Sequence, residues 1–204
     1  MMDHASHWNG RFAGKDYLFG TEPNLFLTQQ AARLPAMGNV LCVADGEGRN
    51  GVCLAAQGHH VTSIDIAEAG LAKARKLAQE RGVSLGLQQA DLAAWDWPED
   101  GFDAVVAIFI QFADPALRAR IFAGMQRATR PGGLILLQGY RPEQIAYDTG
   151  GPSLPDNLYN EDMLREAFTG WDIKHLAVHD SVIEEGPGHS GMSALIDLVA
   201  RKPA

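Results

Sequence analysis

Three glycines follow an apolar stretch of the chain in the pattern G-x-G-x-x-G. They are Gly46, Gly48 and Gly51, and the stretch before them, residues 40–44, is typical of a buried strand. Glycines at this spacing let the backbone turn tightly and approach a ligand, and the N–H groups that begin the following helix face the same ligand. The pattern therefore predicts a site for an adenosine-containing cofactor, although a turn without any ligand could use the same glycines.

Two carboxylates follow the next two apolar runs. Asp65 ends the strand expected over residues 60–64, at a distance from the glycine turn where a carboxylate can accept both hydroxyls of an adenosine ribose. Asp65 could instead cap the helix expected from residue 67. Asp91 follows the strand expected over residues 84–89, and from there a carboxylate could bind the amino group of an adenine. Both positions fit an adenosine site.

Candidate groups for a second ligand lie in segments that follow other strands. Gln111 is polar between apolar neighbours, just after the strand expected over residues 102–109. Phe109 would lie beside the reacting group, although a place in the core is the simpler interpretation. His189, in the turn EEGPGHSG, titrates near neutrality and could remove a proton from a thiol, an amine or a hydroxyl. An exposed turn histidine without a role is the alternative.

Two longer segments could cover such a site. The N-terminal residues 1–34 are expected to form a lid followed by a helix. Residues 140–159 are rich in proline and contain two adjacent glycines, so we expect a long loop over the active site. In these two segments, the candidates for binding the second ligand are Arg11, Tyr17, Tyr140 and Tyr147.

The elements that must position these residues alternate along the chain. Short runs of Val, Ile and Leu alternate with helix-like segments, which is typical of a parallel sheet covered on both faces by helices. The expected strands are residues 40–44, 60–64, 84–89, 102–109, 133–138, 171–183 and 192–200, and the expected helices are residues 26–34, 50–57, 67–81, 115–128 and 161–168. We therefore predict a single α/β domain over residues 1–204. It would be a Rossmann-like, seven-stranded, mostly parallel sheet with a C-terminal antiparallel hairpin.

Composition restricts the class of protein. The chain has 204 residues, of which 46% are hydrophobic, and it contains no apolar run long enough to span a bilayer, so we expect a cytoplasmic domain without membrane contact. A formal net charge of −8 argues against nucleic-acid binding, which draws its affinity from clustered Lys and Arg. Cys42 and Cys53 are expected to be buried thiols, and no metal site is expected.

The order of these motifs resembles the class I methyltransferases that use S-adenosylmethionine (SAM). Four segments carry a narrower resemblance: WNGRFAGKDYLFGTEPNLFL at residues 8–27, ADGEGRNG, YRPEQIAYDTGGP and EEGPGHSG. Together they are similar to small bacterial methyltransferases related to the tellurite-resistance and thiopurine methyltransferase group. One departure is that Ala44 stands where the family turn usually begins with Gly, and Cys42 where it often has an acid. The amino group of the methionine part would then need another acceptor, such as Asp45, a backbone carbonyl or water.

The resemblance implies SAM as the cofactor and a small molecule as the methyl acceptor, such as a thiol or a chalcogen species. The implied cofactor-binding residues are Ala44, Asp45, Gly46, Gly48 and Asn50 at the methionine part, Asp65 and Ile66 at the ribose, Asp91 and Leu92 at the adenine, and Phe109. We expect His189 and Gln111 to be catalytic, Gln111 also to bind the acceptor, and the protein to be a monomer or homodimer. Two alternatives stay open, an NAD-dependent oxidoreductase and a non-catalytic SAM-binding module.

Overall fold

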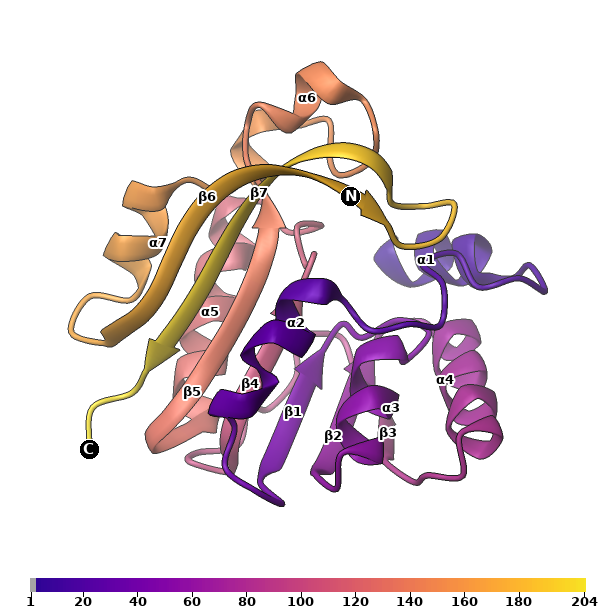
Figure 1. The fold of residues 1–204 in the computed structure, drawn as a ribbon, viewed down its shortest axis with the longest axis horizontal. Coiled ribbons are helices and arrows are strands. Elements are labelled where there is room, and N and C mark those ends of the chain that lie inside the picture. The colour runs from indigo at the N-terminus through magenta and orange to yellow at the C-terminus, as the bar shows by residue number, and fades with distance from the viewer. Residues whose placement is uncertain (1–2) are drawn as a thin grey trace.

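The computed structural model describes residues 3–204, which form a seven-stranded sheet with helices on both faces (Figure 1). The strands are β1 (Asn39–Val43), β2 (His60–Asp65), β3 (Gly86–Gln89), β4 (Phe102–Ile108), β5 (Thr129–Tyr140), β6 (Asp172–Glu184) and β7 (Ser190–Arg201). The helices are α1 (His4–Phe12), α2 (Leu25–Gln30), α3 (Arg49–Ala56), α4 (Glu68–Glu80), α5 (Pro115–Ala128), α6 (Gln144–Tyr147) and α7 (Glu161–Ala167), with 3₁₀ turns at η1 (Ala31–Arg33) and η2 (Pro155–Asn157).

The strand order is β3-β2-β1-β4-β5-β7-β6. The first five strands in this order are parallel, and β7 is antiparallel to both of its neighbours, β5 and β6. Because β6 is antiparallel to β7, it runs in the same direction as β1 to β5, so all six strands end at one edge of the sheet. This arrangement confirms the predicted Rossmann-like, mostly parallel sheet with a C-terminal antiparallel hairpin.

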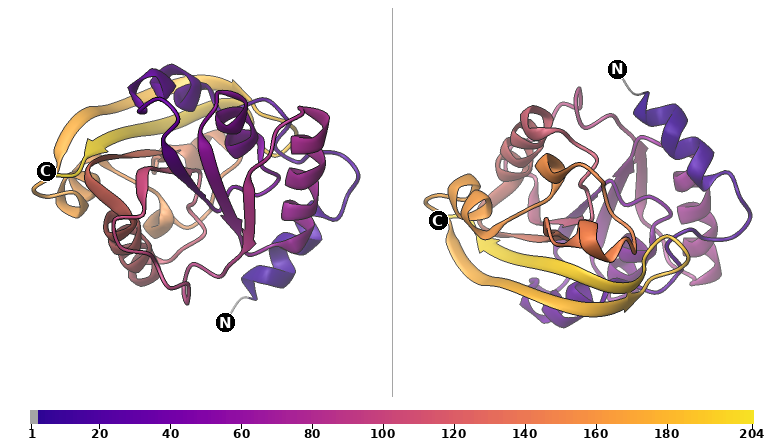
Figure 2. Two further views of the ribbon diagram at one scale, coloured as in Figure 1. Left: turned by 90° about the horizontal axis from the view of Figure 1, so that it is seen from below. Right: turned by 90° about the horizontal axis from the view of Figure 1, so that it is seen from above.

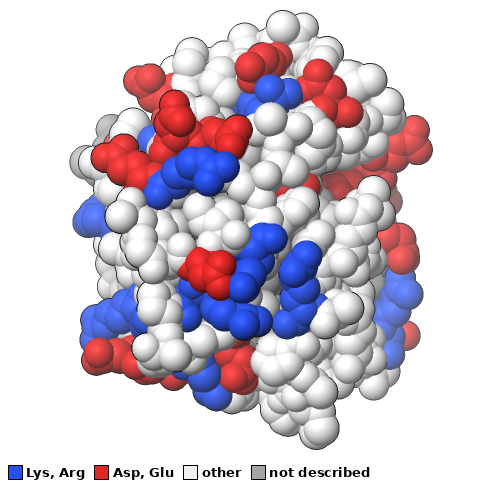
Figure 3. Space-filling view, turned by 60° about the vertical axis from the view of Figure 1, so that its left-hand side comes forward, with Lys and Arg blue, Asp and Glu red and all other residues white. Residues whose placement is uncertain are grey.

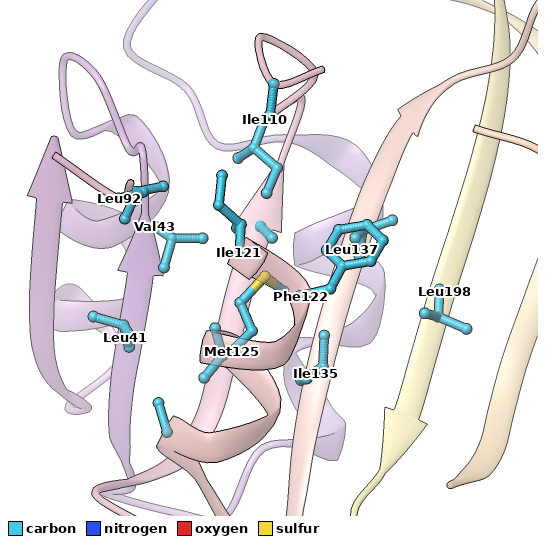
Figure 4. Packing of buried hydrophobic residues seen from close by; sticks show 14 of the residues in the cluster. Leu41, Val43, Leu92, Ile110, Ile121, Phe122, Met125, Ile135, Leu137 and Leu198 are labelled. Atoms are coloured by element: carbon cyan, nitrogen blue, oxygen red, sulfur yellow. The ribbon is translucent and has the colours of Figure 1, made fainter. Parts of the chain in front are cut away.

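Alternation along the strands divides the core into two layers. Val40 and Cys42 of β1 pack on the side of α2 and α3, with Leu54 of α3. Leu41 and Val43 point to the other side, where the core includes buried residues of α5 such as Ile121, Phe122 and Met125, all drawn in Figure 4. The apolar runs of the sequence are continuous rather than alternating because both faces of these strands are covered.

The structure differs from the predicted elements mainly near the chain's N-terminus and in the long loop. The sequence did not predict α1, which starts where the side chain of Asp3 accepts a hydrogen bond from the Ser6 N–H. The expected helix over residues 26–34 is a short α2 followed by the 3₁₀ turn η1. The expected loop 140–159 contains α6 and η2, which are too short to give a helical pattern in the sequence.

The hairpin of β6 and β7 curves over the carboxyl ends of the central strands (Figure 1). In both views of Figure 2, its turn reaches the segment that joins α1 to α2. The Gly188 N–H donates to the Leu18 carbonyl oxygen at 2.9 Å, which fixes this contact. No helix described in residues 3–204 is long and apolar enough to cross a membrane.

Candidate active site at the carboxyl edge of the sheet

The glycine-rich loop joins β1 to α3 and lies at the edge where the parallel strands end. Ala44, Gly46 and Gly48 all have left-handed backbone angles, with φ of 48°, 58° and 86°. A Cβ atom on Gly48 would lie 2.5 Å from the Cβ of Ala74 in α4, so the loop and α4 can approach this closely only if residue 48 is glycine. The loop thus brings its backbone and the first turn of α3 to the edge that the sequence predicted.

Asp65, the last residue of β2, lies beside this loop. Its Oδ2 accepts the Gly46 N–H at 2.8 Å and its Oδ1 accepts the Ala67 N–H at 2.8 Å. Burial raises the pKa of Asp65, and the backbone donors partly offset this effect. Each carboxylate oxygen keeps a further lone pair, so the group can still accept ribose hydroxyls. The predicted ribose position therefore fits the structure.

Asp45 turns its carboxyl group into the protein. Its Oδ2 accepts the Ser63 hydroxyl at 2.7 Å and the Gly51 N–H at 3.1 Å, so it ties the loop to β2 and to the start of α3. Burial, opposed by these two hydrogen bonds, raises the pKa of Asp45 to about 6. The sequence suggested Asp45 as an acceptor for the amino group of the methionine part. Both hydrogen bonds end on Oδ2 and the residue is half-buried, so Asp45 supports the loop and its role toward the cofactor stays a prediction.

The segments expected to flank an adenine lie at the ends of β2 and β3. Ile66 is half-buried, and its carbonyl oxygen accepts a hydrogen bond from the Gln89 side chain at 3.0 Å. Asp91 is exposed, and its Oδ1 accepts the Ala93 N–H at 2.9 Å. The Leu92 side chain is buried in the core. The two segments are held side by side, as a planar base between them would require.

The charged side chains of the glycine loop hold the segments that cover the site. Glu47 is buried, its Oε2 accepts the Leu18 N–H at 2.8 Å and the Phe19 N–H at 3.3 Å, and its Oε1 lies 2.7 Å from Lys73 Nζ. The Asn50 side chain accepts the Asn24 N–H at 2.9 Å.

Arg49 makes a similar pair of contacts. It donates to the Glu22 carbonyl oxygen at 3.3 Å and to Glu185 Oε2 at 2.5 Å. Sequence reasoning missed the roles of Glu47 and Arg49, although charged residues at the variable positions of the glycine pattern were the available signal.

Four rings from different parts of the chain gather where β4, β5 and the β6–β7 hairpin meet at this edge. The ring centroid of His189 lies 4.3 Å from that of Phe19, 4.6 Å from that of Phe109 and 5.7 Å from that of Tyr140. Phe109 follows β4 with a left-handed φ of 55°, and Tyr140 ends β5. His189, only 8% exposed, belongs to the hairpin turn, so the structure brings the predicted base to the edge where the cofactor loop lies.

Two polar atoms in this group are buried without a hydrogen-bond partner among the described residues, His189 Nδ1 and Tyr140 Oη. Burial lowers the pKa of His189 and raises that of Tyr140, so both side chains are neutral near pH 7. A Cβ on Gly150 would lie 3.5 Å from Tyr140 Oη and 3.6 Å from His189 Cδ2, so the loop after α6 closes over both. Buried polar atoms without partners are costly, and a bound ligand can satisfy them.

The structure does not bring every predicted residue to this group. Gln111 is buried, its Nε2 donates to the Tyr140 carbonyl oxygen at 2.8 Å, and its Oε1 accepts the Tyr140 N–H at 2.6 Å. A further hydrogen bond goes to the carbonyl oxygen of Asn157. Both ends of the carboxamide are engaged by backbone, so the predicted catalytic and acceptor-binding roles of Gln111 are corrected to a structural one.

Two predicted tyrosines also lie elsewhere. Tyr17 donates to the Lys73 carbonyl oxygen at 3.2 Å and packs against the small core of α3 and α4. Tyr147 lies on the surface and donates to Asp180 of β6 at 3.0 Å. Arg11 does lie near the aromatic group, with its guanidinium 5.6 Å from the ring centroid of Phe19. The predictions for Tyr17 and Tyr147 as acceptor-binding residues find no support in these contacts.

Comparison with known proteins agrees with this geometry. Residues 40–133 match a family model described as a methyltransferase domain. Phosphatidylethanolamine N-methyltransferase from Cereibacter sphaeroides is 33% identical over 141 residues, which cover 67% of this chain and 68% of that protein. Demethylmenaquinone methyltransferase from Thermus thermophilus is 31% identical over 105 residues, which cover 50% of this chain and 47% of that protein.

Solved structures show the same fold across most of the chain. A structure that concerns conversion of a disulfide bond into a thioacetal group during echinomycin biosynthesis has a TM-score of 0.77 and 21% identity, covering 98% of this chain and 91% of that chain. TehB from Haemophilus influenzae has a TM-score of 0.71 and 20% identity, covering 97% of this chain and 66% of that one. At these identities the likeness is one of fold.

The chain belongs to the SAM-dependent methyltransferases, and SAM is its cofactor. The left-handed glycine loop and the Asp65 carboxylate fit this cofactor, because glycines let the loop backbone approach a ligand closely and the carboxylate keeps lone pairs for a ribose at the same edge. The predictions of a methyltransferase and of its cofactor are confirmed, and the alternative of an NAD-dependent oxidoreductase is wrong.

Proposed function

We propose that this enzyme methylates a small molecule and that His189 removes a proton from the acceptor atom. The observation that carries this proposal is the position of His189, buried among three aromatic rings at the carboxyl edge, with Tyr140 Oη nearby as a second polar group. A histidine with a lowered pKa is neutral at physiological pH and is therefore ready to accept a proton.

The proposed cofactor contacts come from the segments that follow β1, β2, β3 and β4. Backbone groups of Ala44, Gly46, Gly48 and Asn50 would hold the methionine part; Asp65 and Ile66 would hold the ribose; Asp91 and Leu92 would flank the adenine; and Phe109 would lie near the reacting carbon. SAM, when bound, supplies an already activated methyl group on a sulfonium. The protein's main task is then to align the acceptor and exclude water.

The acceptor is proposed to be a thiol or a related chalcogen species. Aromatic rings make favourable contacts with sulfur, and three rings surround His189. In the proposed step, the acceptor S–H proton goes to His189, the sulfur forms a bond to the methyl carbon, and the bond from that carbon to the sulfonium breaks. An amine is the second candidate, favoured by the relation to a phosphatidylethanolamine N-methyltransferase.

Polar groups at the rim of the site and the charge of the surface favour a small acceptor. Arg11, at the rim beside Phe19, would bind an anionic group of the acceptor, and Tyr140 would hydrogen-bond it. On the face drawn in Figure 3, basic and acidic side chains lie interspersed, and the formal net charge is −8, so a small acceptor is favoured over nucleic acid. A cytoplasmic monomer or homodimer completes the proposal.

The cofactor contacts are tested by calorimetric titration with SAM, S-adenosylhomocysteine and NAD. We expect the two adenosyl ligands to bind and Asp65→Ala to weaken both by tenfold or more, that is by about 1.4 kcal/mol or more. The matched control is Asp172→Ala, an exposed aspartate at the opposite end of β6, which should bind like the wild type. Equal affinities in Asp65→Ala and the control would contradict the assigned ribose contact.

The role of His189 is tested by screening thiols and then amines for methyl transfer. We expect His189→Asn to lose about 10²–10⁴-fold in turnover of the accepted substrate while it binds SAM as the wild type does. Unchanged turnover in this variant would exclude His189 as the base.

A further inference from the structure

We infer that Glu185 is a positioning residue, clamped by Arg49 and Asn24 so that His189 keeps its proton on Nδ1 and leaves Nε2 to act as the base. This inference rests on the proposed function of His189. Glu185 Oε2 lies 3.8 Å from His189 Nδ1, and Arg49 Nη2 lies 2.5 Å from the same carboxylate oxygen. The side chains of Arg49 and Glu185 are 7% and 10% exposed, so the pair is screened from solvent.

Asn24 determines the orientation of the second carboxylate oxygen. Its Nδ2 donates to Glu185 Oε1 at 2.9 Å and to Gln138 Oε1 at 2.6 Å, while its Oδ1 accepts the Leu27 N–H at 3.0 Å. Gln138 in turn donates to Asp197 Oδ1 at 2.7 Å. The hydrogen bonds of the Asn24 and Gln138 side chains distinguish the oxygen of each amide from its nitrogen, so the carboxylate of Glu185 has one defined direction.

The charges around His189 favour the same tautomer. The titratable groups that face it are Glu185 on its own turn, Arg49 from α3, Arg11 from α1 and Tyr140 from β5. Burial alone would raise the pKa of Glu185, but His189 and Arg49 outweigh this effect and lower it to about 2. An ionised carboxylate only accepts hydrogen bonds, so the imidazole nitrogen that faces it, Nδ1, is the one that keeps a proton.

The distance of 3.8 Å is longer than a hydrogen bond, and catalytic hydrogen bonds of this kind commonly shorten when a substrate binds. Shortening requires only a small movement of the imidazole, because Arg49 and Asn24 hold the carboxylate in place. In the proposed arrangement, His189 is the base, the Glu185 carboxylate orients its Nδ1, and Arg49 and Asn24 orient the carboxylate.

Arg49 also connects the base to the cofactor loop. It is the first residue of α3 and directly follows Gly48, and its guanidinium reaches Glu185 across 136 positions of the sequence. The position of the base therefore depends on the same loop that is proposed to hold the methionine part of SAM. A displacement of the loop would therefore be transmitted through Arg49 to Glu185 and to the base that Glu185 positions.

The test is nuclear magnetic resonance of the full chain with ¹⁵N-labelled histidine, without cofactor or acceptor. The imidazole shifts report which nitrogen carries the proton, and the His189 signal is assigned by its loss in His189→Asn. For the wild type we expect the proton on Nδ1. In Glu185→Gln we expect the pKa of His189 to fall by about one unit and the two tautomers to become mixed.

Two further variants keep the test decisive. Glu184→Gln, on the exposed side of the same turn, should leave the tautomer and the pKa of His189 as in the wild type. Arg49→Met combined with Glu185→Gln removes both charges together and so avoids an unpaired buried charge, and it should show the same mixed tautomers as Glu185→Gln. A wild-type proton on Nε2, or an unchanged tautomer and pKa in both variants, would overturn the inference.

A pH profile separates positioning from a merely structural role. Once an acceptor is known, the pH at which kcat/KM reaches half its maximum should move by about one unit in Glu185→Gln and stay fixed in Glu184→Gln. An unmoved profile in Glu185→Gln would count against the inference. If SAM fails to bind while the tautomer results hold, the proposed function fails and the clamp stands.

Discussion

The two halves of the carboxyl edge are built in different ways. In the cofactor half, at the ends of β1, β2 and β3, one oxygen of Asp65 accepts the N–H of Ala67, two residues along the chain, and the other accepts the N–H of Gly46 in the glycine loop. In the acceptor half, at the ends of β4, β5 and β6, Tyr140 Oη and His189 Nδ1 are buried without a hydrogen-bond partner among the residues of the described chain, and His189 Nδ1 faces Glu185 at 3.8 Å. The Asp65 carboxylate is thus held by backbone groups of the protein, whereas Tyr140 Oη has no such partner and is proposed to bind the acceptor.

The two halves are joined by side chains of a single loop. Glu47 holds the N-terminal segment and Arg49 holds the hairpin turn, and these two coverings enclose the acceptor half. Backbone geometry forms the cofactor half. The segments that close the acceptor half are held in place by side chains of that same loop.

The largest expected effect tests the backbone of the cofactor half. Gly48→Ala combines a left-handed backbone, which costs about 1–2 kcal/mol, with crowding against Ala74, which costs about 1–3 kcal/mol, so the free energy of unfolding should fall by about 4 kcal/mol. Gly82→Ala has a similar φ of 67° but open space around it, and it should cost only about 1–2 kcal/mol. Urea denaturation measures both, and equal losses would contradict the close approach of loop and α4.

A second prediction concerns the pH dependence that Asp45 gives to the cofactor half. Its pKa is raised from 3.8 to about 6 in the folded protein, so its contribution to stability is fully present below about pH 4 and is lost as the pH rises through 6. Relative to Asp45→Asn, the wild type should lose about 2.5 kcal/mol of unfolding free energy between pH 4 and pH 7. Denaturation curves across this range check it, with Asp172→Asn as the exposed control; parallel pH profiles for wild type and Asp45→Asn would disprove it.

A smaller effect tests the link between the halves. Glu47→Gln removes the charge that faces Lys73 and weakens the acceptor of the Leu18 and Phe19 N–H groups, at a cost of about 2 kcal/mol. Hydrogen exchange at these two amides should then accelerate about 30-fold. Glu80→Gln, from the exposed pair with Lys76, should leave both rates within about twofold. Unaltered exchange in Glu47→Gln would mean that the covering is held by other contacts.

The smallest effect is expected on the outer surface of the acceptor half. Tyr147→Phe removes an exposed hydrogen bond to Asp180 and should change the unfolding free energy by less than about 0.5 kcal/mol, with the acceptor KM unchanged. Tyr140→Phe is the matched change inside the site, and it should raise that KM because it removes the buried Oη. A raised KM in Tyr147→Phe would return this residue to the acceptor site.

The sequence predicted the elements around the glycine loop better than the side-chain contacts of the acceptor half, for a physical reason. The glycine spacing, Asp65 and the apolar strands are local patterns, and each has the same meaning wherever it occurs in a parallel α/β fold. Gln111 was misread because its partners, Tyr140 and Asn157, lie 29 and 46 residues away. Glu185 and Arg49 were missed as a pair because nothing short-range signals a contact across 136 residues. The helix α1 escaped because Gly10 and the aromatic residues of its sequence weaken the helical pattern.

The position of β7 has a consequence for how the molecule is made. Although it is the last strand along the chain, it lies between β5 and β6 and pairs with both. As the chain leaves the ribosome, β1 to β5 can pair in order, but β5 keeps an open edge until the residues of β7 have been synthesised. The acceptor half is therefore the last part to assemble. In a nascent chain, the glycine loop can form between β1 and α3 well before the enzyme is able to turn over a substrate.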